Sequence, residues 1–146
     1  MSNTAAPATQ KVVIVLNGPT DWDEWIGIVK IKAKTGEIWK YMDSSTEKTA
    51  IPALQEPDFP MPADVNNQKI RIADLTPDKK EELQTLRQQY KKKSKKYEQQ
   101  KTALANLKIH IQETISHSYL QYTLKCENTY KMLAALKQCI ASTDQA

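Results

Sequence analysis

The chain has 146 residues, of which 40% are hydrophobic and 26% charged, and its formal net charge at pH 7 is +4. This length suits a single domain with one hydrophobic core, and the longest apolar run, residues 12–16, is too short to cross a bilayer. With only three glycines in the sequence, glycine-rich phosphate loops and tight β-hairpins are nearly excluded. Residues 1–10 lack the basic start and the apolar stretch of a secretory signal, so we expect a cytoplasmic protein.

In chain order, we expect a disordered tail over residues 1–10 and a short extended segment over residues 11–16. A helix is predicted to begin at Thr20 or Asp21, because Asp21 offers a capping side chain with the Glu24 carboxylate three residues on, and acidic residues suit the positive end of the helix dipole. Apolar residues at spacings of three and four give this helix one inner face. That face consists of Trp22, Trp25, Ile26, Val29 and Ala33. Thr35-Gly36 predicts a break, before a short second turn or helix over residues 37–42.

Residues 43–75 are predicted to form an extended connector within the domain. Four prolines fall between positions 52 and 62, and proline removes a backbone donor and disfavours helix at the residue before it. The segment also carries apolar side chains, so we expect it to pack along the surface of the domain. These side chains are Ile51, Leu54, Phe59 and Met61.

A long helix is predicted over about residues 77–116. Thr76-Pro77-Asp78 supplies an N-cap hydroxyl, a proline at the first helical position and then an acid, and no proline or glycine follows. An approximate heptad places apolar side chains at Leu83, Leu86, Tyr90, Tyr97, Leu104, Leu107 and Ile111. The inward positions between them carry polar side chains, which are weak core residues, namely Lys93, Gln100 and Thr114. The helix should therefore pack at both ends and be solvated in the middle, with a break near Lys101 as the alternative.

The rest of the chain is predicted to be helical as well. Residues 116–127 suit either a helix or a bent connection, and Asn128 can cap a last helix over residues 129–140. The apolar face of that helix consists of Tyr130, Leu133, Leu136 and Ile140. A polar tail is expected over residues 142–146. Together the elements predict an all-α fold, a helical bundle with one long helix and the proline-rich extended connector, in a single domain over residues 11–141.

The three tryptophans are the first candidate site. Trp22, Trp25 and Trp39 each offer about 150–250 Å² of area when buried, so we expect them to pack in the core. The sharper alternative is that one of them, such as Trp25, docks a neighbouring subunit, since aromatic side chains are common interface anchors. The same two roles, core or interface, are expected for four leucines: Leu104, Leu107, Leu133 and Leu136.

A run of lysines in the long helix is the second candidate site. These side chains surround most of the helix, and a patch of this kind can bind RNA phosphates without reading bases. The alternative is a solvated helix surface balanced by nearby glutamates. Tyr90 and Tyr97 flank the run and would stack on bases in the first case, or lie in the core or a helix seam in the second. The lysines are Lys91, Lys92, Lys93, Lys95, Lys96 and Lys101.

Catalytic and metal chemistry have little support. His110, Glu113 and His117 would share one face if a helix continued through all three, but a metal there would need a closed, buried shell, so we expect satisfied or exposed histidines. Cys126 and Cys139 are too few for a disulfide framework and are expected to be thiols. No nucleophile elbow, P-loop or dinucleotide fingerprint is present, and we expect neither a metal, a cofactor nor an enzyme.

Two stretches of the chain carry a resemblance to a known family. Residues 16–25 (LNGPTDWDEW) and 38–43 (IWKYMD) resemble the start of Gag polyproteins of copia-type LTR retrotransposons, especially fungal ones. The proline-rich connector, the Lys- and Gln-rich helix and residues 107–122 are also similar to that family, so the resemblance extends over about residues 12–140. The family's second capsid domain, Cys/His zinc knuckle and enzyme segments have no counterpart in these 146 residues.

The resemblance implies a structural, capsid-like protein that self-associates into particle shells around the element's RNA. It implies no membrane contact and no small-molecule substrate. Two alternatives stay open. One is a non-enzymatic RNA-binding module that uses the lysine run. The other is a host-retained adaptor, derived from Gag, that uses the long helix as a coiled-coil arm.

Overall fold

The computed structural model describes residues 13–45, 50–66 and 71–144, and it confirms the predicted all-α class. The α-helices in these residues are α1 (Trp22–Thr35), α2 (Pro77–Glu113), α3 (His117–Leu124) and α4 (Thr129–Asp144). Short 3-10 turns are η1 (Pro19–Asp21), η2 (Trp39–Tyr41), η4 (Pro62–Asp64) and η5 (Ile72–Asp74). The predicted disordered tail over residues 1–10 lies outside the described residues.

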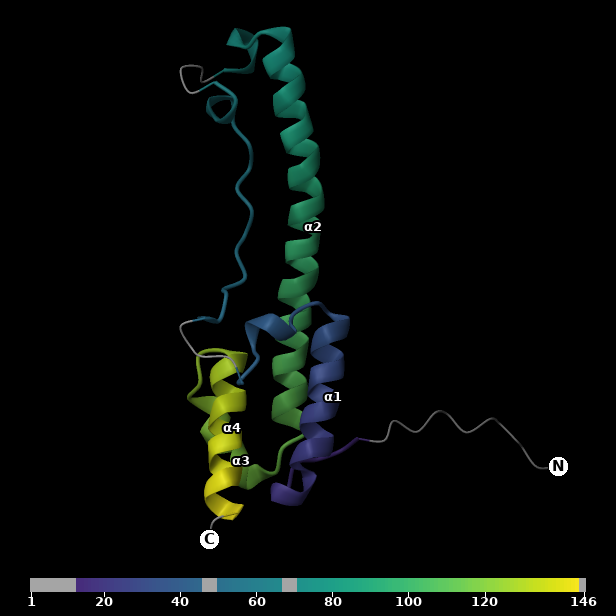
Figure 1. The fold of residues 1–146 in the computed structure, drawn as a ribbon, viewed down its shortest axis with the longest axis vertical. Coiled ribbons are helices and arrows are strands. Elements are labelled where there is room, and N and C mark those ends of the chain that lie inside the picture. The colour runs from purple at the N-terminus through teal and green to yellow at the C-terminus, as the bar shows by residue number, and fades with distance from the viewer. Residues whose placement is uncertain (1–12, 46–49, 67–70, 145–146) are drawn as a thin grey trace, which may run out of the picture.

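The molecule has two parts (Figure 1). In the lower part, which we call the base, α1, α3 and α4 gather around the C-terminal part of α2. In the upper part, which we call the arm, the N-terminal part of α2 projects away from the base with the connector beside it. The base comprises residues 13–45 and 100–144, and the arm comprises residues 50–66 and 71–99.

α1 forms where the apolar spacing predicts it, but its start differs from the expected capping arrangement. The turn η1 precedes it, and no side chain caps the helix at Asp21. The Asp21 carboxylate instead accepts a 3.0 Å hydrogen bond from the backbone N–H of Asn17. The predicted capping role of Asp21 is therefore wrong, because this carboxylate closes the preceding turn. The predicted inner face is confirmed, with Trp25, Val29 and Ala33 buried.

The predicted break after α1 occurs at Gly36 and brings α1 close to α2. A Cβ atom at Gly36 would lie only 2.9 Å from the Cβ of Ala103 in α2. The next residue, Glu37, has a left-handed backbone with φ 57°. The turn η2 then follows within the predicted segment at residues 37–42. Glycine is therefore required at position 36 by a close approach between two helices.

α2 is one continuous helix of 37 residues, so the alternative of a break near Lys101 is wrong. Its start is as predicted, because Thr76 Oγ1 accepts a 3.3 Å hydrogen bond from the backbone N–H of Lys79. At 1.5 Å per residue the helix is about 55 Å long. It ends at Glu113 and not at residue 116, because the chain turns there to pair with the N-terminal segment.

The N-terminal segment crosses the link between α2 and α3. The backbone N–H of Leu16 donates a 2.7 Å hydrogen bond to the carbonyl of Thr114, and the N–H of Ser116 donates one of 2.9 Å to the carbonyl of Leu16. The pairing is an isolated parallel β-bridge between Leu16 and Ile115. The Leu16 side chain is fully buried. The extended segment predicted at residues 11–16 is thus confirmed where it is described, from residue 13 onward.

Residues 116–127 form α3 followed by a short turn, so the helical alternative for this segment is confirmed. Asn128 caps α4 as predicted, because its Oδ1 accepts a 2.8 Å hydrogen bond from the backbone N–H of Lys131. The chain reverses between the two helices, and this reversal lays α4 against α3 in the base (Figure 1).

α4 continues to Asp144, so the predicted end near residue 140 is wrong, and so is the start of the polar tail at residue 142. The reason is that neither glycine nor proline interrupts residues 141–144. Tyr130, expected on the inner face, is only half-buried. The buried apolar side chains of α4 are Met132, Leu133, Leu136 and Ile140.

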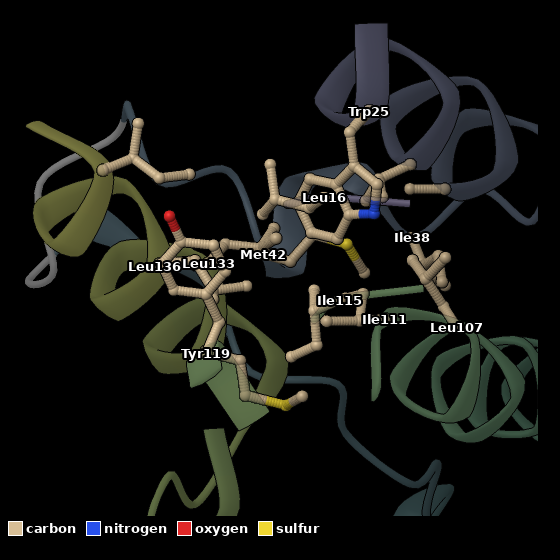
Figure 2. Close-up of a cluster of buried hydrophobic side chains, with 14 residues drawn as sticks. Leu16, Trp25, Ile38, Met42, Leu107, Ile111, Ile115, Tyr119, Leu133 and Leu136 are labelled. Carbon is tan, nitrogen blue, oxygen red and sulfur yellow. The ribbon is translucent and has the colours of Figure 1, made fainter. Parts of the chain in front are cut away.

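The main hydrophobic core lies in the base, where side chains from all four helices converge (Figure 2). It combines two stretches that are far apart in the sequence, residues 16–42 and 107–140. Its buried members are Leu16, Trp25, Val29, Ala33, Ile38, Met42, Leu107, Ile111, Ile115, Tyr119, Met132, Leu133, Leu136 and Ile140. The base is therefore closed by contacts between the two ends of the described chain.

The arm has a smaller hydrophobic cluster near its tip. Val65 and Leu75 from the connector cover Leu83 of α2, and Leu86 packs against the three. Together with the core contacts of Leu107 and the residues around it, this cluster confirms that the long helix packs at both ends.

Between the two clusters the connector runs beside α2 (Figure 1). Phe59 meets Tyr90 edge-on, with 5.3 Å between ring centroids. The Arg87 guanidinium lies 4.6 Å from the centroid of the Phe59 ring, and its Nε donates a 3.1 Å hydrogen bond to the carbonyl of Pro60. The predicted packing of the connector is confirmed. Phe59 and Met61 still remain 50% and 52% exposed, because the connector contacts a single helix here.

Candidate interaction surfaces

Trp25 lies inside the base and ties α1 to the end of α2. Its Nε1 donates a 2.9 Å hydrogen bond to Oγ1 of Thr114, and this hydroxyl donates in turn to the carbonyl of His110 at 2.7 Å. The indole N–H is therefore satisfied, as a buried donor needs to be. Trp25 is only 1% exposed. Of its two expected roles, the structure places it in the core and not at a docking surface.

The other two tryptophans pack against the same core but remain partly open to solvent. The ring centroids of Trp22 and Trp25 are 5.6 Å apart, with an angle of 35° between the ring planes. The ammonium group of Lys30 lies 5.6 Å from the centroid of the Trp39 ring. The three tryptophans thus share one interior, and Trp22 and Trp39 keep some surface available for a partner.

The four leucines face the base. Leu107, Leu133 and Leu136 are buried in the main core, and Leu104 packs half-buried against it. A coiled coil built on Leu104 and Leu107 would need both side chains to be free. Because Leu107 lies in the main core (Figure 2) and Leu104 packs against that core, these leucines act inside the chain.

Two of the polar residues at inward positions of the heptad are buried and form hydrogen bonds. Gln100 is 7% exposed, and its Nε2 donates a 2.9 Å hydrogen bond to the carbonyl of Glu37, at the turn that follows α1. Thr114 is 3% exposed and holds Trp25. The sequence contained a signal for both, since a polar side chain in an inward register needs a partner. Lys93, the third weak position, is exposed.

All six lysines of the predicted basic run are exposed along α2. Lys96 Nζ lies 4.0 Å from the Glu37 carboxylate, and Lys101 Nζ lies 6.0 Å from the centroid of the Tyr97 ring. Among the described residues, the other lysines of the run form no ion pair. Their ammonium groups are accessible to an anionic partner.

The two tyrosines beside the lysines face the connector. Tyr90 packs on Phe59, and Tyr97 lines an open hollow that Pro57 and Leu54 border from the connector side. Both tyrosines are half-buried. Both tyrosines therefore pack between the helix and the connector. This position favours the packing interpretation over stacking on nucleic-acid bases.

Single apolar side chains are exposed on three helices of the base. Ile31 of α1, Ile109 of α2 and Leu124 of α3 are 67%, 51% and 66% exposed. Isolated exposed aliphatic residues are ordinary on soluble proteins, so they do not mark an interface by themselves.

The two histidines do not share a helix face, because α2 ends at Glu113 and His117 begins α3. His110 lines a hollow with Trp25 and Lys32, and its burial, together with the charge of Lys32, lowers the pKa of the imidazole. In the ranges that the structure describes, no three His, Cys, Asp or Glu side chains are grouped to hold a metal ion. No helix in those ranges is long and apolar enough to cross a membrane. The two cysteines are not joined by a disulfide.

The described residues expose apolar and basic surface on different parts of the molecule. The half-buried Trp22 and Trp39 offer apolar area on the base, and the lysine run offers positive charge on the arm. No family model, no curated protein and no solved structure matches the chain.

Proposed function

We propose that the chain is a non-enzymatic structural protein of the Gag type, from a copia-type LTR retrotransposon, which self-associates into cytoplasmic particle shells around the element's RNA. One observation carries the proposal. The two stretches that resemble that family, residues 16–25 and 38–43, supply Leu16, Trp25, Ile38 and Met42 to the main core. The residues that carry the resemblance thus form part of the hydrophobic core of a helical domain, and a capsid-like domain requires such a core.

The shape of the molecule supports the same proposal. Its main hydrophobic core lies in the base, and α2 extends far beyond that core (Figure 1). An extended molecule of this kind presents much surface for each residue it buries, and such surface is useful for contact with further copies. Half-buried aromatic side chains such as Trp22 and Trp39 are frequent anchors of protein interfaces.

The mass of the full chain in solution tests the proposal. Size-exclusion chromatography with light scattering, from low to high micromolar protein, should give an average mass that rises above the 16.6 kDa of one chain. Negative-stain electron microscopy of the concentrated sample should then show regular assemblies. A mass of one chain at every concentration, with and without RNA, would contradict the proposal.

The exposed lysine run favours a second candidate, a non-enzymatic RNA-binding module. Each phosphate contact releases counterions, so the affinity for a labelled single-stranded RNA should fall steeply as salt is raised, by a log–log slope of about −0.7 per contact. Fluorescence anisotropy at several salt concentrations measures this slope. The absence of binding at low salt would remove the candidate.

The third candidate, a host-retained coiled-coil adaptor, has less support. A coiled-coil arm on the long helix would use Leu104 and Leu107 to bind its partner, and both side chains pack toward the core of the base. Their replacement by lysine would disrupt the fold as well as any partner contact, so this substitution cannot distinguish an adaptor from a self-associating protein.

A further inference from the structure

A hollow lies between the connector and the first half of α2, and we call it the arm hollow. Its volume is about 550 Å³, within the range of roughly 300–1,000 Å³ that is usual for ligand sites. Phe59 and Ile72 border it from the connector side. One face of α2 forms the opposite wall, and the buried Leu83 is part of that wall.

Among the described residues, every charged side chain that lines the arm hollow is basic. Lys80 and Lys91 are exposed and form no ion pair with another described residue. Arg87 lies between them on the same helix face, and its Nε donates to the carbonyl of Pro60. The two other nitrogen groups of a guanidinium can donate further hydrogen bonds. The arm hollow therefore favours an anionic ligand.

The arm hollow also offers groups that suit a nucleobase. Phe59 is held by Arg87, 4.6 Å from its ring centroid, and by the edge-on contact with Tyr90, and half of its surface stays open to solvent. Gln84 and Gln88 are exposed, line the hollow and stand one helical turn apart. Each of these amides provides both a donor and an acceptor. Sites for single-stranded nucleic acid combine such a basic groove with aromatic side chains on which bases stack.

We propose that the arm hollow binds a short stretch of single-stranded RNA, with a base packed on Phe59 and phosphates on Lys80 and Lys91. This inference rests on the RNA-binding candidate and names its site. Of the predicted lysine run only Lys91 lines the hollow, while Lys80 and Arg87 lie outside that run. The site is independent of self-association, which is measured separately.

A strand fits the arm hollow better than a free nucleotide or a lipid does. Lys80 and Lys91 are eleven residues apart in α2, which corresponds to about 16 Å along the helix axis. A strand carries phosphates at regular intervals and can reach both lysines, whereas a free nucleotide carries its phosphates at one end. A lipid tail would gain most from an enclosed apolar cavity, but exposed amide and ammonium groups border this hollow.

The phosphate contacts are tested by fluorescence anisotropy with the full chain and a labelled oligouridylate of about eight nucleotides. The variant K80Q/K91Q should weaken binding about tenfold. It should also reduce the log–log salt slope by about 1.4, because each lost contact contributes about 0.7. The matched control K92Q/K95Q removes the same charge at two exposed lysines of α2 that do not line the hollow. It should weaken binding about threefold at most, through the general field of the helix.

The base contact is tested at Phe59. The variant F59L keeps an apolar side chain but loses the ring, so it should weaken oligouridylate binding about fivefold or more. It should leave the binding of linear inorganic polyphosphate unchanged, and F59Y, which keeps an aromatic ring, should bind RNA like the wild type. Ultraviolet cross-linking followed by mass spectrometry should attach the RNA to the peptide that contains Phe59 in the wild type.

Four results would overturn the inference in distinguishable ways. If the wild type does not bind the RNA at low salt, the RNA-binding candidate and the site both fail. If K80Q/K91Q binds as tightly as K92Q/K95Q, the arm hollow is wrong while RNA binding by the chain stands. If F59L binds RNA like the wild type, the hollow holds phosphate only. If oligoglutamate displaces the RNA as effectively as unlabelled oligouridylate does, the hollow selects an acidic chain and not a nucleic acid.

Discussion

The base and the arm share one helix but are stabilised by different means. In the base, α2 meets side chains from α1, α3 and α4, and 14 hydrophobic residues are buried in one cluster. In the arm, the same helix packs mainly against the connector, and the buried cluster contains Val65, Leu75 and Leu83. Because hydrophobic stabilisation grows with the apolar area removed from water, most of the stability resides in the base. A continuous helix can thus differ in stability along its length.

The largest effect is expected from Trp25→Ala in the base. The substitution removes a buried indole and its hydrogen bond to Thr114, and it should lower the free energy of unfolding by about 3–5 kcal/mol. Chemical denaturation followed by circular dichroism measures the loss.

The counterpart in the arm is Leu83→Ala, which also removes a buried side chain. It should speed hydrogen exchange in residues 77–90 and leave exchange in α1 and α4 at the wild-type rate. If α1 and α4 exchanged faster to the same degree as the arm, the base and the arm would be one cooperative unit and the comparison would fail.

The second largest effect is expected at the contact between α1 and α2. Gly36→Ala would place a Cβ atom 2.9 Å from the Cβ of Ala103, and overpacking of this kind costs about 1–3 kcal/mol. Adding Ala103→Gly should restore most of the loss. Gly27→Ala is the control, because a Cβ atom there meets nothing within 4 Å and should stabilise α1 by up to about 1 kcal/mol. Thermal unfolding compares Gly36→Ala, the double variant and Gly27→Ala. Equal melting temperatures would refute the close approach between α1 and α2.

Local signals in the sequence were enough to predict most of the elements. The inner face of α1, the connector, the start of α2 at Thr76-Pro77 and the cap at Asn128 all depend on residues within a few positions of one another. Such signals act through backbone geometry and side-chain spacing, so they operate before any tertiary contact forms.

The features that sequence reasoning missed depend on residues far apart in the chain. The end of α2 follows from the bridge between Leu16 and Ile115, and the burial of Gln100 follows from the carbonyl of Glu37. For the candidate surfaces, charge predicted the exposure of the lysines and size predicted the burial of Trp25, while Trp22 and Trp39 are only half-buried. The position of the connector along α2 depends on contacts such as that between Phe59 and Tyr90, and no local pattern specifies that register.

A smaller effect is expected from Phe59→Ala in the arm. The substitution removes the edge-on contact with Tyr90 and the ring beneath the Arg87 guanidinium, which together are worth about 0.5–1.5 kcal/mol. Its clearest consequence should be faster proteolysis within residues 50–66, with little change in the global unfolding transition. Pro52→Ala, at an exposed connector position, is the control. Unchanged proteolysis in the Phe59 variant would show that other contacts hold the connector.

The smallest effect is expected from pH. Burial, followed by the charge of Lys32, lowers the pKa of His110 in the folded chain below the ordinary value of 6.5. The folded state therefore binds fewer protons than the unfolded state at pH values just below 6.5. The contribution of His110 to stability is fully present above pH 6.5 and is lost as the pH falls below that value. His110→Gln should flatten this part of the stability profile, measured by denaturation between pH 5 and 8. His117→Gln controls for the loss of an imidazole from the surface of α3, and an unaltered slope in the His110 variant would assign the pH dependence elsewhere.

The bridge between Leu16 and Ile115 has a consequence for biosynthesis. Leu16 and α1 leave the ribosome before their partners in the core, which extend from residue 107 to residue 140. At about 5–20 residues per second, the nascent α1 waits roughly 5–20 s with Trp25 and Val29 uncovered. Translation speed through the arm therefore determines how long this apolar helix is exposed to chaperones or to neighbouring nascent chains.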